Sequence, residues 1–381
     1  MSIDLLPENL LCAVGNKKFS TILADPLLKK IFYNQRGIAL LMALGSITLM
    51  LAAVLQANID AKYAIEATAV TKERHELTYD AMSGIIIAQA ILIKDKTDNP
   101  KGYDSLCEDW GRQEKIREVL NALPDGAGKP TKLVISDELG KIQLNALVDA
   151  KTGKVNSAQD LLWDRAIRDI VSSPTYESDS EIINETRSII DCMIDWIDEN
   201  DELHGINSVE SDYYEGLETP YKSRNNYFSN INELLLVKGI TKQLFNSVGI
   251  ANYVTVYGQS NAKNSVIYPG KININTADQG VLRLLIKEGD EEYLPDVIEY
   301  RDERNEDGGC MNDLSSLGAY ESMFGKIFHN DLITTNSHLF RVDSTATIDQ
   351  TTKTVTAILY RNQDPKTKRW TCEVVSYKDT R

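Results

Sequence analysis

The chain has 381 residues, enough for two ordinary domains or one domain with a large insertion, and its 42% hydrophobic and 25% charged residues allow a sizeable core. The formal net charge of −15 disfavours nucleic-acid binding, because phosphate contacts need clustered lysine and arginine. The same charge is compatible with a domain in an export compartment and with divalent cations.

The first feature along the chain is an uncharged, proline-free apolar run at 37–55, preceded by a polar segment that contains basic residues. A helix of about 19 residues just crosses the ~30 Å hydrocarbon core of a bilayer. The basic residues before the run place the N-terminus in the cytoplasm and the bulk of the chain outside the inner membrane, in the periplasm. A secretory signal peptide would instead have its apolar core near the start of the chain, followed by a small-residue cleavage site. The simplest interpretation is a membrane anchor that only tethers a globular domain.

The boundary of this run, Gln35-Arg36-Gly37-Ile38, resembles the cleavage point of type IV prepilins and pseudopilins. In those proteins a membrane peptidase cuts after the glycine, so Ile38 becomes the first mature residue and Met42 the fifth. Most members of that superfamily carry glutamate at the fifth position, and only one pseudopilin class habitually lacks it. We therefore expect a cytoplasmic leader at 1–37 and a transmembrane or assembly helix at 38–56.

Beyond the membrane run, apolar residues at three- and four-residue spacing predict that the helix continues to about Asp95, a total of roughly 55 residues. A coiled-coil stalk is the alternative, but the stripe is rich in alanine and irregular, which favours packing on a sheet. Residues 132–145 predict a β-hairpin, and a short helix is expected from Gln113 to Leu120.

The chain then becomes helical and finally returns to strands. Asn275 or Thr276 is expected to cap one of the helices. This order predicts an α+β fold in which one antiparallel sheet packs on the long helix and a helical block interrupts the sheet. The expected divisions are a first head part at 57–149, an inserted α-helical domain at 150–333 and C-terminal head strands at 334–381. The expected helices are 159–171, 180–198, 231–236, 241–246, 277–287 and 294–303, and the expected strands are 338–348, 354–361 and 369–377.

The densest acidic stretch is a candidate metal site. Calcium prefers six to eight oxygen ligands from carboxylates, amides and carbonyls on a flexible loop. These oxygens converge if the loop doubles back, although the stretch has no EF-hand spacing and a solvated acidic loop is the alternative. The candidate ligands are Asp198, Asn200, Asp201, Glu210 and Asp212.

Other functions find little support in the sequence. The run at 272–277 is similar to helix-hairpin-helix DNA-binding modules, but the Gly-hydrophobic-Gly hairpin that they need does not follow it. No phosphate loop, GxSxG or HExxH motif is present and the four histidines are scattered, so we expect no enzyme. Four cysteines follow the leader, Cys107, Cys192, Cys310 and Cys372, and they allow three disulfide pairings, none of which the spacing favours.

Taken together, the chain resembles the general secretion pathway protein K family, the large minor pseudopilins of the type II secretion system. The resemblance implies a pilin-like α+β head with a large α-domain inserted into its sheet. It also implies calcium in that α-domain, with Trp196 and Tyr213 holding the ends of the acidic loop. The motifs that carry the resemblance are the Arg36-Gly37 boundary without glutamate at Met42 and the segments 137–147, 195–198, 212–214, 218–221, 232–239 and 272–277.

The resemblance further implies a subunit at the tip of a pseudopilus, where it starts assembly and supports protein export across the outer membrane. Met42 lacks the charge that meets the terminal amine of a neighbouring subunit, and a bulky α-domain would clash with a subunit above it. The implied partners are I-type and J-type minor pseudopilins, the major pseudopilin, the prepilin peptidase, the inner-membrane assembly platform and secreted substrates. A membrane-anchored periplasmic receptor with no filament role is the alternative.

Overall fold

The computed structural model describes residues 37–98, 102–124, 128–172, 182–247, 250–260 and 266–380. Almost all of the expected leader, residues 1–36, lies outside these ranges. The chain divides into two compact units, 1–73 and 74–381, and each is described by itself.

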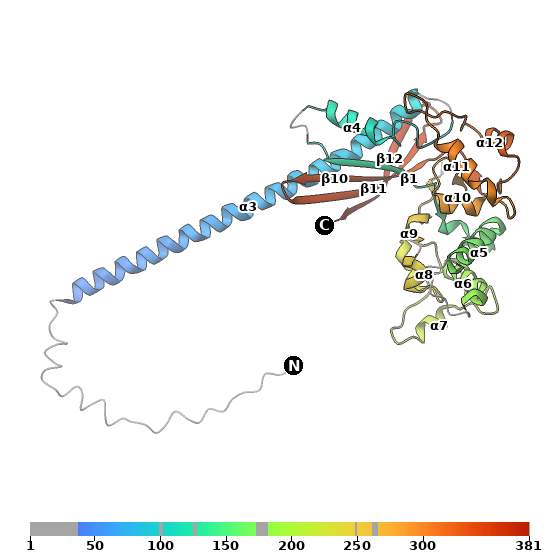
Figure 1. The fold of residues 1–381 in the computed structure, drawn as a ribbon. Helices are drawn as coiled ribbons and strands as arrows, with labels where there is room; N and C mark the ends of the chain where they lie inside the picture. Colours follow the sequence, from blue (N-terminus) through green and yellow to red (C-terminus); the bar gives the residue numbers. More distant parts are fainter. Residues whose placement is uncertain are drawn as a thin grey trace, which may run out of the picture. The chain divides into compact units, whose positions relative to one another are not determined.

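Helix α3 (Ile38–Asp98) begins directly after Gly37 and runs for 61 residues, which confirms the long helix expected from the sequence (Figure 1). Its N-terminal part contains an 18-residue window with a mean hydropathy of 2.5, none of it buried. In the described part of the chain, α3 is the one helix long and apolar enough to cross a membrane.

Within the second unit, the C-terminal part of α3 packs against a sheet. Leu77, Ala81, Ala88 and Leu92 recur at the spacing of one helix face and are fully buried. Gly84 lies on the same face, and a Cβ added there would be 2.9 Å from Ser344 Cβ, so only glycine permits this approach. The Ala-rich stripe thus brings the helix backbone close to the strands.

The sheet has four antiparallel strands in the order β1-β10-β11-β12. Alternate residues point toward α3, and these include Ile135, Val342 and Ala357, which follow one another across three strands. A register shift between Ile358 and Leu359 interrupts the pairing with the last strand. The strands are β1 (Lys132–Asp137), β10 (Leu339–Ile348), β11 (Thr351–Gln363) and β12 (Trp370–Thr380), and α4 (Gln113–Ala122) packs on the same core.

The hairpin expected at 132–145 is wrong. Strand β1 pairs with β10, and the following strand β2 (Ile142–Gln143) pairs in parallel with β5 (Val254–Thr255). Asp137, the last residue of β1, accepts a hydrogen bond from the backbone N–H of Leu139. The chain does not fold back there to pair with β1. The chain then enters a separate core, because Leu144 and Leu147 are buried there rather than on the sheet.

The helical block enters between β1 and β10, as predicted (Figure 1). It also contains α12 (Leu317–Phe324), which the sequence analysis missed. Its other helices are η2 (Leu144–Ala146), α5 (Ser157–Val171), α6 (Ile182–Ile197), α7 (Ser211–Glu215), η3 (Ile231–Leu236), α8 (Lys242–Ser247), α9 (Ile250–Tyr253), α10 (Gln279–Leu285), η4 (Glu291–Tyr293) and α11 (Leu294–Asp302). Its remaining short strands are β3 (Val148–Asp149), β4 (Lys154–Val155), β6 (Gln259–Ser260), β7 (Val266–Ile267), β8 (Ile272–Asn273) and β9 (Ile333–Thr334).

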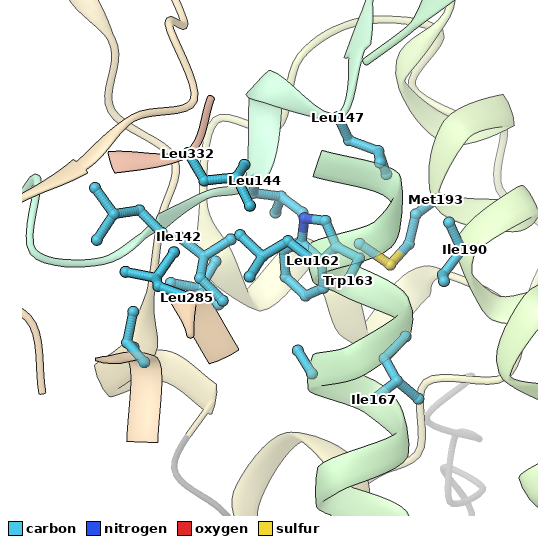
Figure 2. Close-up of a cluster of buried hydrophobic side chains, with 14 of the residues drawn as sticks. Ile142, Leu144, Leu147, Leu162, Trp163, Ile167, Ile190, Met193, Leu285 and Leu332 are labelled. Atoms are coloured by element: carbon cyan, nitrogen blue, oxygen red, sulfur yellow. The ribbon is translucent and has the colours of Figure 1, made fainter. Parts of the chain in front are cut away.

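The core of this block forms around α5. Leu162 and Trp163 of that helix meet Leu144 from η2, Met193 from α6 and Leu285 from α10 (Figure 2). These side chains are almost completely buried, and truncating one of them to alanine typically costs about 2–5 kcal/mol. The block therefore has its own hydrophobic core, separate from the one between α3 and the sheet.

A buried polar network and a disulfide join the block to the head. Asn273 donates to the Asp104 carbonyl, to the Asp137 carboxylate and to the Ser337 hydroxyl. The expected cap of α10 is wrong, because Asp278 accepts the hydrogen bond from the helix terminus. Asn275 and Thr276 instead bond within the network, since both follow directly on β8. The network lies near a disulfide between Cys107 and Cys310, which leaves Cys192 and Cys372 free.

Candidate metal centre

The acidic loop lies between the end of α6 and the start of α7. Asp195 and Asp198 stand three residues apart at the end of α6, so both carboxylates emerge on the same side of the helix. Glu210 occupies the residue before α7 and brings the chain back to them. All three side chains are buried, with exposed fractions of 0%, 3% and 8%, respectively. We refer to Asp195, Asp198, Asp201 and Glu210 as the carboxylate cluster.

Several oxygens of this cluster have no hydrogen-bond partner among the described residues. They are both carboxylate oxygens of Glu210, one of Asp198 and one of Asp195. Buried carboxylate oxygens in native proteins are nearly always bonded, and an unpaired buried charge is costly. These buried oxygens therefore need a positively charged group to pair with when the carboxylates are ionised.

The pKa values of three buried carboxyl groups in the cluster are raised. Burial raises the pKa of Glu210 to about 8, and the like charges of Asp195, Asp198 and Asp201 add to the effect. Burial, with Asp195 nearby, raises the pKa of Asp198 to about 6, and burial also raises the pKa of Asp195. Without a cation Glu210 retains its proton near neutral pH. A metal that binds there must displace that proton.

The other sequence-predicted ligands occupy different positions. Asn200 donates its amide to Asp198 at 2.8 Å, and its oxygen accepts from the backbone N–H of Glu202. Asp201 is exposed at the edge of the cluster, near enough to raise the pKa of Glu210. Asp212 is exposed in the first turn of α7, unlike the buried Glu210 two residues before it.

Asp195 was not among the predicted ligands. The signal that would have found it is its three-residue spacing from Asp198 at the end of a predicted helix, which puts both carboxylates on one helix face.

Aromatic residues pack together at the ends of the loop. Trp196 is buried and meets the ring of Tyr214 edge to face, with the ring centroids 5.3 Å apart. Tyr213 is 41% exposed, but its ring also meets Tyr214 edge to face and lies under the Lys238 ammonium, so its anchoring role stays a prediction. The helical turn of α7 directs Tyr214 inward and Tyr213 outward.

The donor set suits a hard cation. Calcium binds carboxylate and carbonyl oxygens in loops of variable geometry, and its charge would offset the carboxylates that the protein leaves unpaired. Asp195, Asp198 and Glu210 would hold it, with Asp201 beside them. The unpartnered oxygens are of the type that calcium prefers, although the described carboxylates of this cluster are not all within 4.8 Å of one another, as those of the head are.

A second acidic cluster lies in the head, where Asp95, Asp104 and Glu108 bring their oxygens within 4.8 Å of one another. This group already contains two cations, because Lys96 lies 3.1 Å from Asp104 and Arg361 pairs with both aspartates. Glu108 lies beside these ion pairs and accepts hydrogen bonds from the Ser105 backbone N–H and the Trp110 indole, and we call the five side chains the head network. The protein itself supplies the positive charge that a metal would bring.

The residues expected to govern assembly lie at the start of α3. Gly37 directly precedes the helix, and Ile38 is its first residue. Met42 is 68% exposed and lies one turn further along, where its carbonyl accepts a hydrogen bond from Ser46. Nothing in the described chain lies within 4 Å of a Cβ added to Gly37.

Comparisons with known proteins bear on this geometry. Residues 140–259, which include the carboxylate cluster, match the family model described as type II secretion system protein K. The type II secretion system protein K of Aeromonas hydrophila is 28% identical over 219 residues, which make up 56% of this chain. The matched region spans about three fifths of that protein, 61% of its length.

The fold also matches a solved structure. A chain in the crystal structure of the GspK-GspI-GspJ complex from enterotoxigenic Escherichia coli aligns with a TM-score of 0.55 and 15% sequence identity. The alignment covers 82% of this chain and 99% of that one. A likeness at this identity concerns the fold, and it includes the α+β head with additional helices.

Proposed function

The three likenesses support a minor pseudopilin of the GspK type, and we propose that the chain occupies the tip of a type II secretion pseudopilus. The observation that carries this proposal is the helical block inserted between β1 and β10. A subunit within a filament must leave room for a neighbour stacked above it. The block makes the head too bulky for that position, and the end of the filament accommodates it.

The start of α3 supports the same position. In a pilin-like stack, a carboxylate at the fifth residue meets the terminal amine of the neighbouring subunit. Cleavage after Gly37 makes Met42 the fifth residue, and its thioether offers no charge for that pair. The chain therefore lacks the contact that would hold it within the shaft.

Membrane placement follows from the apolar part of α3. We propose a single span in the inner membrane, with the N-terminus in the cytoplasm and the head in the periplasm, which agrees with basic residues before the span. The partners proposed are the I-type and J-type minor pseudopilins, the major pseudopilin, the prepilin peptidase and the assembly platform. At the tip, the chain would initiate assembly and support protein export, a structural role that requires no catalysis.

The carboxylate cluster is proposed to bind calcium. The bound cation would neutralise the buried carboxylates and tie the end of α6 to the start of α7. Binding only to the native state then stabilises the block by RT ln(1 + [Ca²⁺]/Kd). Bound calcium would thus stabilise the inserted block, which is the feature that supports the proposed tip position.

Two measurements test the tip proposal. N-terminal sequencing of the purified protein is expected to begin at Ile38, and an intact leader would instead favour the plain membrane anchor. Immunogold labelling of isolated pseudopili is expected to give one label at a filament end. Labels spaced along the shaft would contradict the proposal, and an absence of filament-associated label would favour the membrane-tethered receptor.

A further inference from the structure

Asn225, which lies outside the acidic loop, has an unusual backbone conformation. Asn225 has a φ of 45°, in the left-handed region that few non-glycine residues adopt, although asparagine tolerates it best. It lies in the segment 221–228, which follows α7 and precedes η3. Such conformations persist only where the surrounding structure holds them, and they cluster at binding sites.

The side chain of Asn225 reaches across to the acidic loop. Its amide nitrogen donates to a carboxylate oxygen of Asp201 at 3.0 Å and approaches the Asn200 carbonyl at 3.5 Å. Its amide oxygen accepts from the Ser223 hydroxyl, and that hydroxyl lies 2.6 Å from the hydroxyl of Ser211. Ser211 directly follows Glu210, so this chain of contacts reaches both sides of the carboxylate cluster.

The segment that carries Asn225 is itself fixed to the core of the block. The buried side chain of Asn145 accepts from the backbone N–H of Phe228 at 2.8 Å and donates to its carbonyl at 3.0 Å. The hydroxyl of Tyr227 accepts from the backbone N–H of Ala150. Asn225 therefore extends from a rigid support rather than from a free loop.

We infer that Asn225 is a positioning residue that fixes Asp201 and the backbone of Asn200 beside Asp198, and so preorganises the carboxylate cluster for a divalent cation. Asn200 donates its own amide to the buried carboxylate of Asp198 at 2.8 Å, so the hydrogen bonds of Asn225 hold both residues at the open side of the cluster. A cation that enters the cluster then finds the carboxylates assembled and incurs less ordering cost. This inference rests on the proposed calcium function.

The test compares Asn225→Gly with the wild-type full-length protein in detergent. Glycine accepts the positive φ without strain and removes only the amide, so loss of the hydrogen bond is separated from backbone strain. Isothermal titration with calcium is expected to show a 10- to 100-fold weaker Kd, the range typical when a group that orients metal ligands is lost. The thermal midpoint of the calcium-free variant should stay close to wild type, since Asn225 is only partly buried.

Asn226→Gly is the matched control, because Asn226 is the adjacent residue and its side chain accepts a hydrogen bond from the backbone N–H of its own chain neighbour, Tyr227. It is expected to bind calcium within twofold of wild type. A Kd for Asn225→Gly within twofold of a calcium-binding wild type would overturn this inference and leave the calcium proposal standing. Absence of calcium binding by the wild type would overturn both.

Discussion

The chain contains two buried groups of carboxylates, and they are completed in different ways. In the head network, Asp95, Asp104 and Glu108 surround Lys96 and the fully buried Arg361. In the carboxylate cluster of the inserted block, four buried carboxylate oxygens have no partner among the described residues. The first group is completed by the protein's own cations, whereas no lysine or arginine of the described residues pairs with the unpartnered oxygens of the second.

The difference follows from the secondary structure that supplies each group. The head network joins α3 to β11, two long elements whose relative position the sheet core fixes, so Arg361 can be placed reliably between two aspartates. Its guanidinium also lies over the ring of Phe340, 4.5 Å from the centroid. The carboxylate cluster lies on a loop between two helices. An exchangeable cation can complete such a loop.

The largest expected effect comes from breaking the head network. Arg361→Met removes the charge that neutralises Asp95 and Asp104, while the apolar part of the side chain is approximately retained. Leaving buried carboxylates without a partner typically costs about 3–5 kcal/mol, so the free energy of unfolding should fall by that amount. Urea denaturation in saturating calcium measures this loss.

Arg341→Met is the matched control, because Arg341 pairs with Asp343 on the same sheet but is partly exposed. An exposed pair contributes about 0–1 kcal/mol. Equal losses in the two variants would contradict the view that the head network is a buried structural ion-pair group.

A smaller effect is expected from Glu210→Gln in the carboxylate cluster. The amide cannot supply the charge that calcium requires, so the calcium-dependent stabilisation should disappear, about 2.7 kcal/mol at a calcium concentration of 100 Kd. Thermal unfolding with calcium and with chelator measures this difference. Asp212→Asn serves as the control, and its exposed carboxylate should leave the calcium effect intact. If Asp212→Asn abolished the calcium effect and Glu210→Gln did not, Asp212 rather than Glu210 would be the calcium ligand.

The smallest effect is a pH dependence of the head. Burial raises the pKa of Asp95 to about 6 and that of Glu108 to about 7. The native state then holds protons that the unfolded chain releases, so their contribution is fully present below pH 4 and is lost as the pH rises through 6–7. In Glu108→Gln, the fall in unfolding free energy from pH 5 to pH 8 should be smaller than in the wild type by about 1–2 kcal/mol.

This pH measurement needs saturating calcium, which keeps the carboxylates of the inserted block deprotonated throughout. Lys115→Gln, which removes an exposed charge at the same end of the head, is the control and should retain the wild-type slope. A wild-type stability that rises across this range would contradict the pKa directions given for the head network.

Much of the fold could be predicted from the sequence because its strongest patterns are long. The apolar run and the Ala-rich stripe define α3, and three alternating segments define the C-terminal strands. The hairpin at 132–145 was predicted wrongly because local turn residues do not reveal which distant strand completes a pair. Strand β1 finds β10 about 200 residues later, across the inserted block.

The carboxylate cluster could be predicted only in part. Acidic density identified Asp198 and Glu210 as candidates, but it gave no means of separating buried carboxylates from exposed ones such as Asp212. The helix face shared by Asp195 and Asp198 was readable from spacing and was overlooked. The contribution of Asn225 was not readable, because its contact with Asp201 depends on how the segment after α7 folds back.

Calcium bound by the carboxylate cluster should be detected by native mass spectrometry of the full-length protein. The wild-type mass is expected to include bound calcium, removable by chelator, with protons taken up in its place. Glu210→Gln should lose that calcium, whereas Glu108→Gln should retain it. A wild-type protein that carries no calcium after purification in calcium-containing buffer would contradict the calcium proposal.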